Sequence, residues 1–388
     1  MIHFNAFART FLASVLLGGA LVACDKDKDV EPPKALVAFN ARVAVDRVWN
    51  ASLGGKDKKL RLALAPAVES GHLYAAGADG TVAAFDAASG RALWRQTTKM
   101  PLAAGPGVGA ELVVVGALNG QVVALDAATG TRRWAVRTSG EVLAAPVVTS
   151  AGVLLRTVDG RLHKLALADG KEQWANDQTV PPLTLRGSAS PTVVGDVVVG
   201  AFDNGKVSAY AISNGDVLWD TAVSPSRGKT ELERLVDIDG PVVADGRDLF
   251  VVGFQGRVAQ IGLDSGQIWW SRDASSYRGL ALAGDSLFVS SADSKVVALS
   301  RKDGTERWSQ DALARRGITR PAVDGDAIVV ADFQGVVHWL DRATGEVIGR
   351  ADTARKARVT TAPLAVDGMV YVQNDAGQVF ALRARPRS

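Results

Sequence analysis

The sequence predicts an all-β protein, an eight-bladed β-propeller with four-stranded antiparallel blades. Three observations support this prediction: a repeat of about forty residues, strand-like alternation within each repeat, and a tryptophan at a fixed place after its second glycine turn. Units of this length built from short strands are typical of propeller blades, and none has room for an amphipathic helix of ordinary length. The first turn of each repeat falls at Gly80, Gly120, Gly160, Gly205, Gly256, Ser294, Gly335 and Gly377.

The segments between the turns have the character of short strands. Residues 112–115 and 121–125 are rich in Val, Ala and Leu, and they are bounded by Gly, Asp and Asn. Such runs predict strands that end in tight turns. Three strands are evident in each unit, and the segment that carries the tryptophan predicts a fourth.

The tryptophan pattern predicts how the ring closes. The seventh repeat has Gly349 at the tryptophan position, and the eighth ends near Leu382 with no residues left for its outer strand. Trp49 lies upstream of the first repeat, so we predict that an N-terminal strand completes the last blade. The other repeats place the large indole between neighbouring blades. Their tryptophans are Trp94, Trp134, Trp174, Trp219, Trp270 and Trp308.

The first residues are typical of a secretory signal. Residues 1–23 contain no acidic residue, and their apolar run from Phe11 to Val22 is too short to span a bilayer. The run leads into Leu-Val-Ala-Cys, the pattern of a bacterial lipobox, and Cys24 is the only cysteine of the chain. We therefore expect residues 1–23 to be a lipoprotein signal peptide and Cys24 to carry the lipid that anchors the protein to a membrane.

The remainder divides into a tether and one domain. Residues 24–38 are rich in charged residues and contain two consecutive prolines, so we expect a lipidated N-terminal tether. Residues 39–384 are expected to form the propeller. In enteric bacteria an Asp directly after the lipidated Cys favours the inner membrane. Asp25 therefore leaves inner-membrane retention open beside the expected outer-membrane location facing the periplasm.

The composition offers little for catalysis. The four histidines form no pair at metal-ligand spacing, the single cysteine is assigned to lipid, and no nucleophile–base arrangement is evident. A net charge of +3 spread along the chain argues against a nucleic-acid partner, which needs a clustered basic face. We expect no catalytic residue, no metal site and no cofactor, and hence no enzyme.

Two connections between consecutive repeats are unusually long and occupy the same topological position, so they should lie side by side on one face. The first loop, residues 180–191, contains two leucines followed by an arginine, and the second loop, residues 228–240, is rich in acidic residues. They form either a partner-binding site or a local cluster in which Arg186 pairs with Asp237 or Asp239 over leucines packed under their own loop. Asp237-x-Asp239-Gly240 also resembles the start of a calcium loop, but later ligands are absent.

The blade motif resembles that of quinoprotein dehydrogenases. Residues 124–134 match the pattern Ala-x-Asp-x-x-Thr-Gly-x-x-x-Trp of their tryptophan docking motif. The resemblance implies an alternative function, a dehydrogenase that uses pyrroloquinoline quinone (PQQ) or a quinone-binding remnant of one. The adjacent cysteines that accompany the quinone in that family are absent here.

The lipobox, the eight blades, the two loops and the segment Val337-His338-Trp339-Leu340 together resemble the BamB family. That resemblance implies a non-catalytic scaffold lipoprotein of the outer-membrane β-barrel assembly (BAM) machinery, bound to the POTRA region of BamA beside other BAM subunits. It also implies that this chain binds BamA through a set of loop residues. A further hypothesis is that exposed blade edges bind unfolded outer-membrane protein precursors. The implied BamA contacts are Leu183, Leu185, Arg186, Asp237 and Asp239.

Overall fold

The computed structural model describes residues 31–54, 62–187, 189–354 and 357–387. The predicted signal peptide and Cys24 lie outside the described residues. So do the basic residues of a third long connection, which leads from Trp49 to Pro66: Lys56, Lys58, Lys59 and Arg61. Residues 33–388 form one compact unit. The described ranges contain strands and turns but no helix, and accordingly none of them holds a helix long and apolar enough to cross a membrane.

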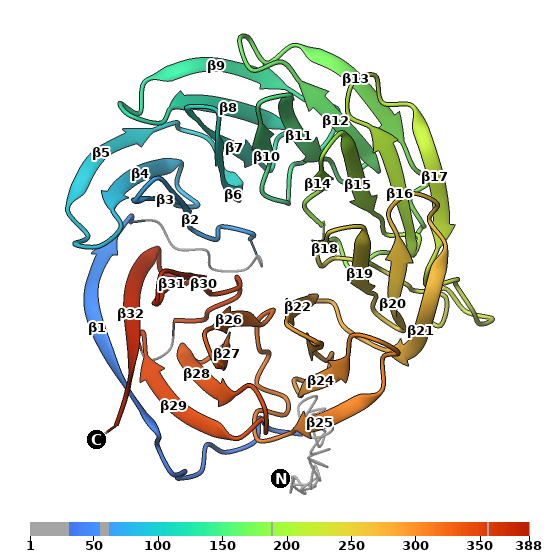
Figure 1. The fold of residues 1–388 in the computed structure, drawn as a ribbon. Coiled ribbons are helices and arrows are strands. Elements are labelled where there is room, and N and C mark those ends of the chain that lie inside the picture. The colour runs from blue at the N-terminus through green and yellow to red at the C-terminus, as the bar shows by residue number, and fades with distance from the viewer. Residues whose placement is uncertain (1–30, 55–61, 188, 355–356, 388) are drawn as a thin grey trace, which may run out of the picture. The chain divides into compact units, whose positions relative to one another are not determined.

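Residues 33–388 form eight four-stranded sheets arranged around a centre (Figure 1). Seven of these sheets are continuous in sequence, and each runs from an inner to an outer strand. This arrangement confirms the predicted eight-bladed propeller. Blades 1 and 2 consist of β2 (Ala67–Glu69), β3 (His72–Ala76), β4 (Thr81–Asp86) and β5 (Ala92–Thr97), and of β6 (Leu102–Gly109), β7 (Leu112–Ala117), β8 (Gln121–Asp126) and β9 (Arg132–Arg137).

The next three blades repeat this order and carry the long connections. Blade 3 consists of β10 (Val147–Thr149), β11 (Gly152–Arg156), β12 (Arg161–Leu165) and β13 (Glu172–Asp177). Blade 4 consists of β14 (Thr192–Val194), β15 (Val197–Ala201), β16 (Lys206–Ala211) and β17 (Val217–Ala222). Blade 5 consists of β18 (Val243–Asp245), β19 (Asp248–Val252), β20 (Gly256–Gly262) and β21 (Ile268–Ala274).

The last three blades complete the circle. Blade 6 consists of β22 (Leu280–Ala283), β23 (Ser286–Ser290), β24 (Val296–Ser300) and β25 (Glu306–Gln310). Blade 7 consists of β26 (Ala322–Asp324), β27 (Ala327–Ala331), β28 (Val336–Asp341) and β29 (Val347–Asp352). Blade 8 consists of β30 (Leu364–Val366), β31 (Met369–Gln373), β32 (Gln378–Pro386) and the N-terminal strand β1 (Val43–Ser52).

Blade 8 therefore takes its outer strand from the N-terminus, as the tryptophan pattern predicts. Strand β1 pairs antiparallel with β32, from Val43 opposite Pro386 to Ser52 opposite Gln378. The first and last strands of the unit thus share one ladder, and buried residues of blades 8 and 1 pack into one hydrophobic cluster.

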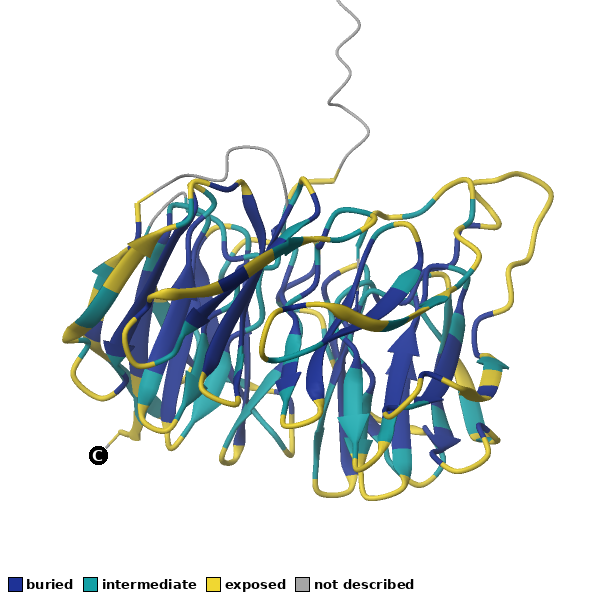
Figure 2. Ribbon diagram, turned by 90° about the horizontal axis from the view of Figure 1, so that it is seen from above, coloured by how far each residue is buried: buried dark blue, intermediate teal, exposed yellow. Residues whose placement is uncertain are grey.

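The core lies on the middle strands of each blade. All residues of β7 are buried, whereas the outer strand β9 buries only Trp134. Figure 2 shows the same gradient, with buried residues along the strands and exposed residues at the turns at both ends. The blades thus pack face to face and leave their outer strands in contact with solvent.

Each repeated tryptophan joins its blade to the next one. Its indole lies on the second-turn glycine of the following blade, where a Cβ would come within 2.5–2.8 Å of the ring, and that glycine has a positive φ. Its Nε1 donates to a carbonyl oxygen in the same turn at 2.6–3.1 Å. The tryptophan–glycine pairs are Trp49–Gly90, Trp94–Gly130, Trp134–Gly170, Trp174–Gly215, Trp219–Gly266, Trp270–Gly304 and Trp308–Gly345.

The missing tryptophan of the seventh repeat has a structural reason. Gly349 lies on β29, against the start of β1, and a Cβ at this position would overlap Val43. Val43 and Val45 pack into the hydrophobic cluster of blades 7 and 8. The closing strand therefore fills the space that an indole fills at the other interfaces.

Candidate partner-binding site

The candidate site lies where the first loop (residues 180–191) and the second loop (residues 228–240) meet. The first loop precedes β14 and the second precedes β18, so each leads from the outer strand of one blade to the inner strand of the next. The backbone N–H of Leu185 donates to Oδ2 of Asp237 at 2.8 Å. This hydrogen bond places the two loops side by side, as their common topological position predicts.

The first loop presents apolar side chains to solvent. Leu183 is 40% exposed and Leu185 is 38% exposed, so the two leucines do not pack under their own loop as the alternative interpretation expected. The backbone of Arg186 adopts a positive φ of 56°. The conformation holds both leucines at the surface, where they are available to a partner.

Arg186 pairs with a residue that the sequence analysis did not consider. Its guanidinium forms an ion pair with Glu141, which lies on the connection between β9 and β10. The predicted local pair with Asp237 or Asp239 is therefore wrong. Three successive inter-blade connections contribute to this surface, and the exposed guanidinium remains accessible beside the leucines.

The second loop supports its own exposed tip. The Glu233 carboxylate accepts hydrogen bonds from the backbone N–H groups of Lys229 and Thr230, at 2.7 and 3.1 Å, and the Thr230 hydroxyl accepts one from the N–H of Glu233. These backbone donors lower the pKa of Glu233. The closed turn projects Leu232, which is 65% exposed.

Asp237 lies in the interior rather than at the surface. Its side chain is fully buried, and its backbone carbonyl accepts a hydrogen bond from the N–H of Phe254 at 2.7 Å. Burial, followed by the charges of Asp239 and Asp203, raises the pKa of Asp237 to about 9. Asp237 therefore reaches the leucine surface only through its hydrogen bond to Leu185.

Asp239 lies next to Asp237 and is also largely enclosed. Burial, followed by the charge of Asp203, raises its pKa to about 7, and Arg156 opposes this shift. A Cβ at Gly187 would overlap the Asp239 carboxylate, so the first loop closes directly over it. The glycine at this position is required by the close approach of the two loops.

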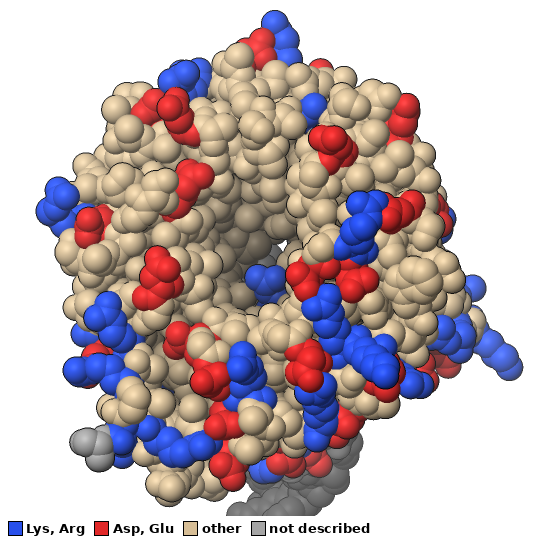
Figure 3. Space-filling model, in the orientation of Figure 1, with Lys and Arg blue, Asp and Glu red and all other residues tan. Residues whose placement is uncertain are grey.

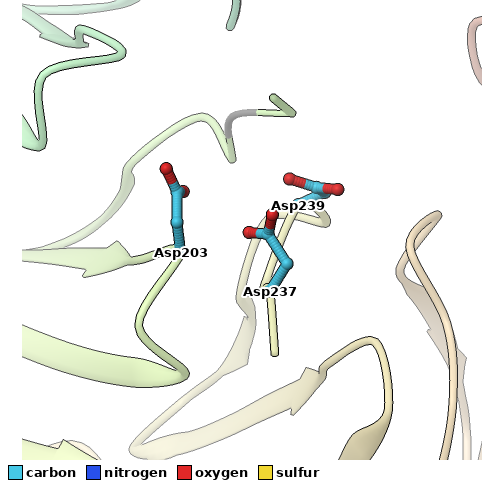
Figure 4. A group of neighbouring side chains, drawn as sticks. All are labelled: Asp203, Asp237 and Asp239. Atoms are coloured by element: carbon cyan, nitrogen blue, oxygen red, sulfur yellow. The ribbon is translucent and has the colours of Figure 1, made fainter. Parts of the chain in front are cut away.

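A third carboxylate and its arginine complete the buried cluster. Asp203, in the turn between β15 and β16, pairs with Arg156 at the end of β11 at 2.8 Å, and both are buried. Figure 4 shows Asp203, Asp237 and Asp239 turned toward a common space. Sequence reasoning missed Asp203, although a signal was present. Asp203 stands two residues before the first turn of the fourth repeat, a position that is acidic in only one other repeat, at Asp375. The remaining six repeats have apolar residues there: Ala78, Leu118, Val158, Phe254, Ala292 and Phe333.

The charges around the ring are mixed. Figure 3 shows acidic and basic side chains interspersed on the face in view, around a hollow centre. On that face no single-sign stripe of the kind that binds a nucleic-acid backbone is visible. The candidate site is thus an apolar surface with a charged border, which is typical of protein–protein contacts.

The sequence and the fold are both similar to those of known proteins. The profile of the family described as "Outer membrane protein assembly factor BamB" matches residues 78–310 and 292–386. The assembly factor of that name from Pseudomonas aeruginosa is 40% identical over 374 residues, which cover 96% of this chain and 98% of the relative.

Two solved structures share the fold. The crystal structure of BamB from Moraxella catarrhalis aligns with a TM-score of 0.80 and 27% identity, over 88% of this chain and all of that one. A quinohemoprotein alcohol dehydrogenase from Comamonas testosteroni aligns with a TM-score of 0.71 at 14% identity, over 89% of this chain and 78% of that one. At that identity the likeness concerns the fold alone.

Proposed function

The chain belongs to the BamB family, and from this membership we propose that it is an assembly factor for outer membrane proteins that acts as a non-catalytic scaffold. The matches to its relatives extend over nearly the whole chain, including both long loops. The repeated tryptophan motif supports the same proposal, because its indoles pack at blade interfaces around the ring and thus have a structural role.

We propose that the first loop is the surface that binds the POTRA region of BamA. Leu183 and Leu185 would lose water against the partner, and Arg186 at their side would set the orientation of the complex. Asp237 and Asp239 take a supporting role, since both lie behind the loop. The observation that carries this proposal is the pair of exposed leucines, held at the surface by a hydrogen bond to a buried carboxylate.

The test is a triple variant, Leu183→Ala with Leu185→Ala and Arg186→Ala, assayed by co-purification with BamA from solubilised membranes. We expect at least a tenfold loss of bound BamA, because exposed anchors of this kind each contribute about 1–2 kcal/mol or more. Leu218→Ala is the matched control, since Leu218 is a half-exposed leucine on the outer strand β17, away from both loops. Equal recovery of BamA with the triple variant and the wild type would rule the surface out.

The proposal extends to the membrane anchor and the other partners. We propose that a lipid on Cys24 holds the protein at the outer membrane facing the periplasm, beside other BAM subunits. A Cys24→Ser variant that stayed with the membranes would contradict the anchor. Recovery of the wild-type protein in the inner-membrane fraction would contradict the outer-membrane location and favour retention through Asp25. Binding of unfolded precursors is tested separately, by site-specific crosslinking from the outer strands.

The quinone alternative has only the fold in its favour. The motif shared with the dehydrogenases packs blade against blade in this chain, and the solved dehydrogenase is 14% identical. Quinone absorbance in the purified protein, or dye reduction that depends on added quinone, would support the dehydrogenase alternative.

A further inference from the structure

The buried carboxylates behind the first loop are arranged as cation ligands. We propose that Asp203, Asp237 and Asp239 form a binding site for a calcium ion. Each residue offers a carboxylate oxygen, and these three oxygens lie within 4.8 Å of one another. Calcium–oxygen bonds are about 2.3–2.6 Å long, so oxygens on opposite sides of one ion are about 5 Å apart. A single ion therefore reaches all three residues from the space that they face in Figure 4.

Unpartnered buried oxygens point independently to a ligand. Asp237 is fully buried, and its Oδ2 accepts the hydrogen bond from Leu185, whereas its Oδ1 has no hydrogen-bond partner among the residues that the structure describes. Oδ1 of Asp239 is likewise buried without a hydrogen-bond partner. A buried polar atom without a partner is costly, and for a carboxylate oxygen the cost is higher still. A bound cation would satisfy both oxygens at once.

The local charges lead to the same conclusion. The Arg156 guanidinium is engaged by Asp203 and by the carbonyl of Ala201. Among the described residues, Asp237 and Asp239 form no ion pair, although the charges of Arg156 and Arg278 oppose the effect of burial, which raises the pKa of Asp239. Two ionised carboxylates side by side in an enclosed space repel each other and lose their hydration, at a cost in free energy. A divalent cation removes that cost, because its charge is balanced by the two carboxylates.

The donor set favours calcium over magnesium. All ligand atoms are carboxylate oxygens, and they come from two separate segments, a turn within blade 4 and the second loop. Calcium accepts irregular cages of this kind, whereas magnesium demands near-ideal octahedral geometry and retains its water. An ion at this position would tie the second loop to blade 4, directly under the first loop.

A shared proton is the competing explanation. If one of the two neighbouring aspartates is protonated, it can donate a hydrogen bond to the other and relieve the repulsion without a metal. The two explanations differ in their response to calcium. A proton-sharing pair has no affinity for the ion, while a calcium site is saturable and sensitive to a chelator.

The experiment is calorimetric titration of calcium chloride into the full mature chain after treatment with EDTA, with magnesium chloride titrated in parallel. We expect one saturable calcium site and weaker or no magnesium binding. The thermal midpoint should rise with calcium and fall back when EDTA is added. In Asp239→Asn the calcium affinity should drop at least tenfold. Asp326→Asn, which alters an exposed aspartate of blade 7, is the matched control and should bind like the wild type.

Three outcomes would overturn the site. One is the absence of saturable binding up to about 10 mM calcium, the weak end for extracellular calcium modules, together with a thermal midpoint that EDTA does not change. The others are undiminished binding in folded Asp239→Asn and a preference for magnesium. If Asp239→Asn does not fold, the titration and the chelator response of the wild type still decide between ion and proton.

Discussion

Asp237 contacts the first loop through one hydrogen bond, which its Oδ2 accepts from the backbone N–H of Leu185 at 2.8 Å. The donor belongs to one of the two exposed leucines, so the orientation of the proposed binding surface depends on a buried acceptor. We expect Asp237→Ala to weaken recovery of BamA, because the N–H of Leu185 loses its partner and the loop is released. Asp237→Asn keeps an acceptor oxygen and should restore most of the binding.

The rescue distinguishes positioning from direct contact. Co-purification should be measured in EDTA, so that calcium makes no contribution, and the far-ultraviolet circular dichroism of each variant should match that of the wild type. If Asp237→Asn fails as completely as Asp237→Ala, the acceptor role is wrong. Exposed Asp273, on β21, offers an Asn substitution as the surface control.

We expect His338 to make the stability of the protein sensitive to mild acid. It is fully buried on β28, its Nε2 lies 3.1 Å from Asp332 Oδ2, and its Nδ1 accepts a hydrogen bond from Nε of Arg350 at 3.3 Å. Burial lowers the pKa of His338, against the opposing effect of Asp332, while the nearby Arg350 and Arg316 also lower it. The imidazole is therefore neutral in the folded protein.

The sign of the pH dependence follows from this lowered pKa. As pH falls below about 6.5, the unfolded chain binds a proton at His338 that the folded chain refuses, so stability is present above that pH and is lost below it. Between pH 7 and pH 5 this residue should account for a loss of at most about 2 kcal/mol. Urea unfolding at the two pH values measures it, and His338→Gln should reduce the difference. The same substitution at partly exposed His72 is the control, and equal slopes for His338→Gln and the wild type would contradict the assignment.

At the scale of the blade, the contact between an indole and a glycine is the recurring structural device. Gly170 has a φ of 72°, and a Cβ there would lie 2.6 Å from the ring of Trp134. Gly195 has a similar φ of 56° but open space around it, so Gly195→Ala measures the cost of the backbone conformation alone. We expect Gly170→Ala to destabilise the protein by about 1–3 kcal/mol more than Gly195→Ala, because the extra methyl group overpacks the interface.

Equilibrium unfolding of the two variants in urea tests the comparison. Equal losses of stability would mean that the indole contact adds nothing to the backbone strain. The pair is well matched, since both substitutions add one methyl group to a turn glycine with positive φ.

These blade contacts also explain which features the sequence could predict. The turn glycine and the tryptophan, such as Gly170 and Trp134, recur at fixed spacing because each blade repeats the same local geometry. The strands and the closure of the ring by the strand that carries Trp49 could therefore be predicted from the periodicity. One turn departs from the pattern, since the positive φ in the fifth repeat falls on Gln255 rather than on Gly256. A one-residue shift of this kind leaves the periodicity intact, so the sequence alone does not reveal it.

The candidate site was less accessible, because its partners come from different repeats. Glu141 pairs with Arg186 from an ordinary short connection, and Asp203 approaches Asp237 from a turn within the neighbouring blade. Such contacts depend on how one blade is rotated against the next. Periodicity carries no information about that rotation, although an acidic residue at a position that is apolar in six of the eight repeats was a usable signal.

At the scale of the whole molecule, the ring is held together by a ladder between its two ends. Strand β1 covers the edge of β32, fills the interface with blade 7 through Val43, and places Trp49 on Gly90 of blade 1. Removing residues 39–50 therefore opens two blade interfaces and exposes a long strand edge. The loss of Trp49 alone should cost about 3–5 kcal/mol, a large part of a net stability of about 5–15 kcal/mol.

We expect the chain without residues 39–50 to aggregate, whereas a chain that begins at residue 39 keeps β1 and should remain monomeric. Size-exclusion chromatography with light scattering separates the two outcomes, and thermal unfolding reports the remaining stability. A monomeric deletion variant with an unchanged thermal midpoint would mean that the ring does not depend on its N-terminal strand. Because only fourteen residues separate the expected lipid on Cys24 from this segment, the closing strand would also be the element that connects the membrane anchor to the propeller.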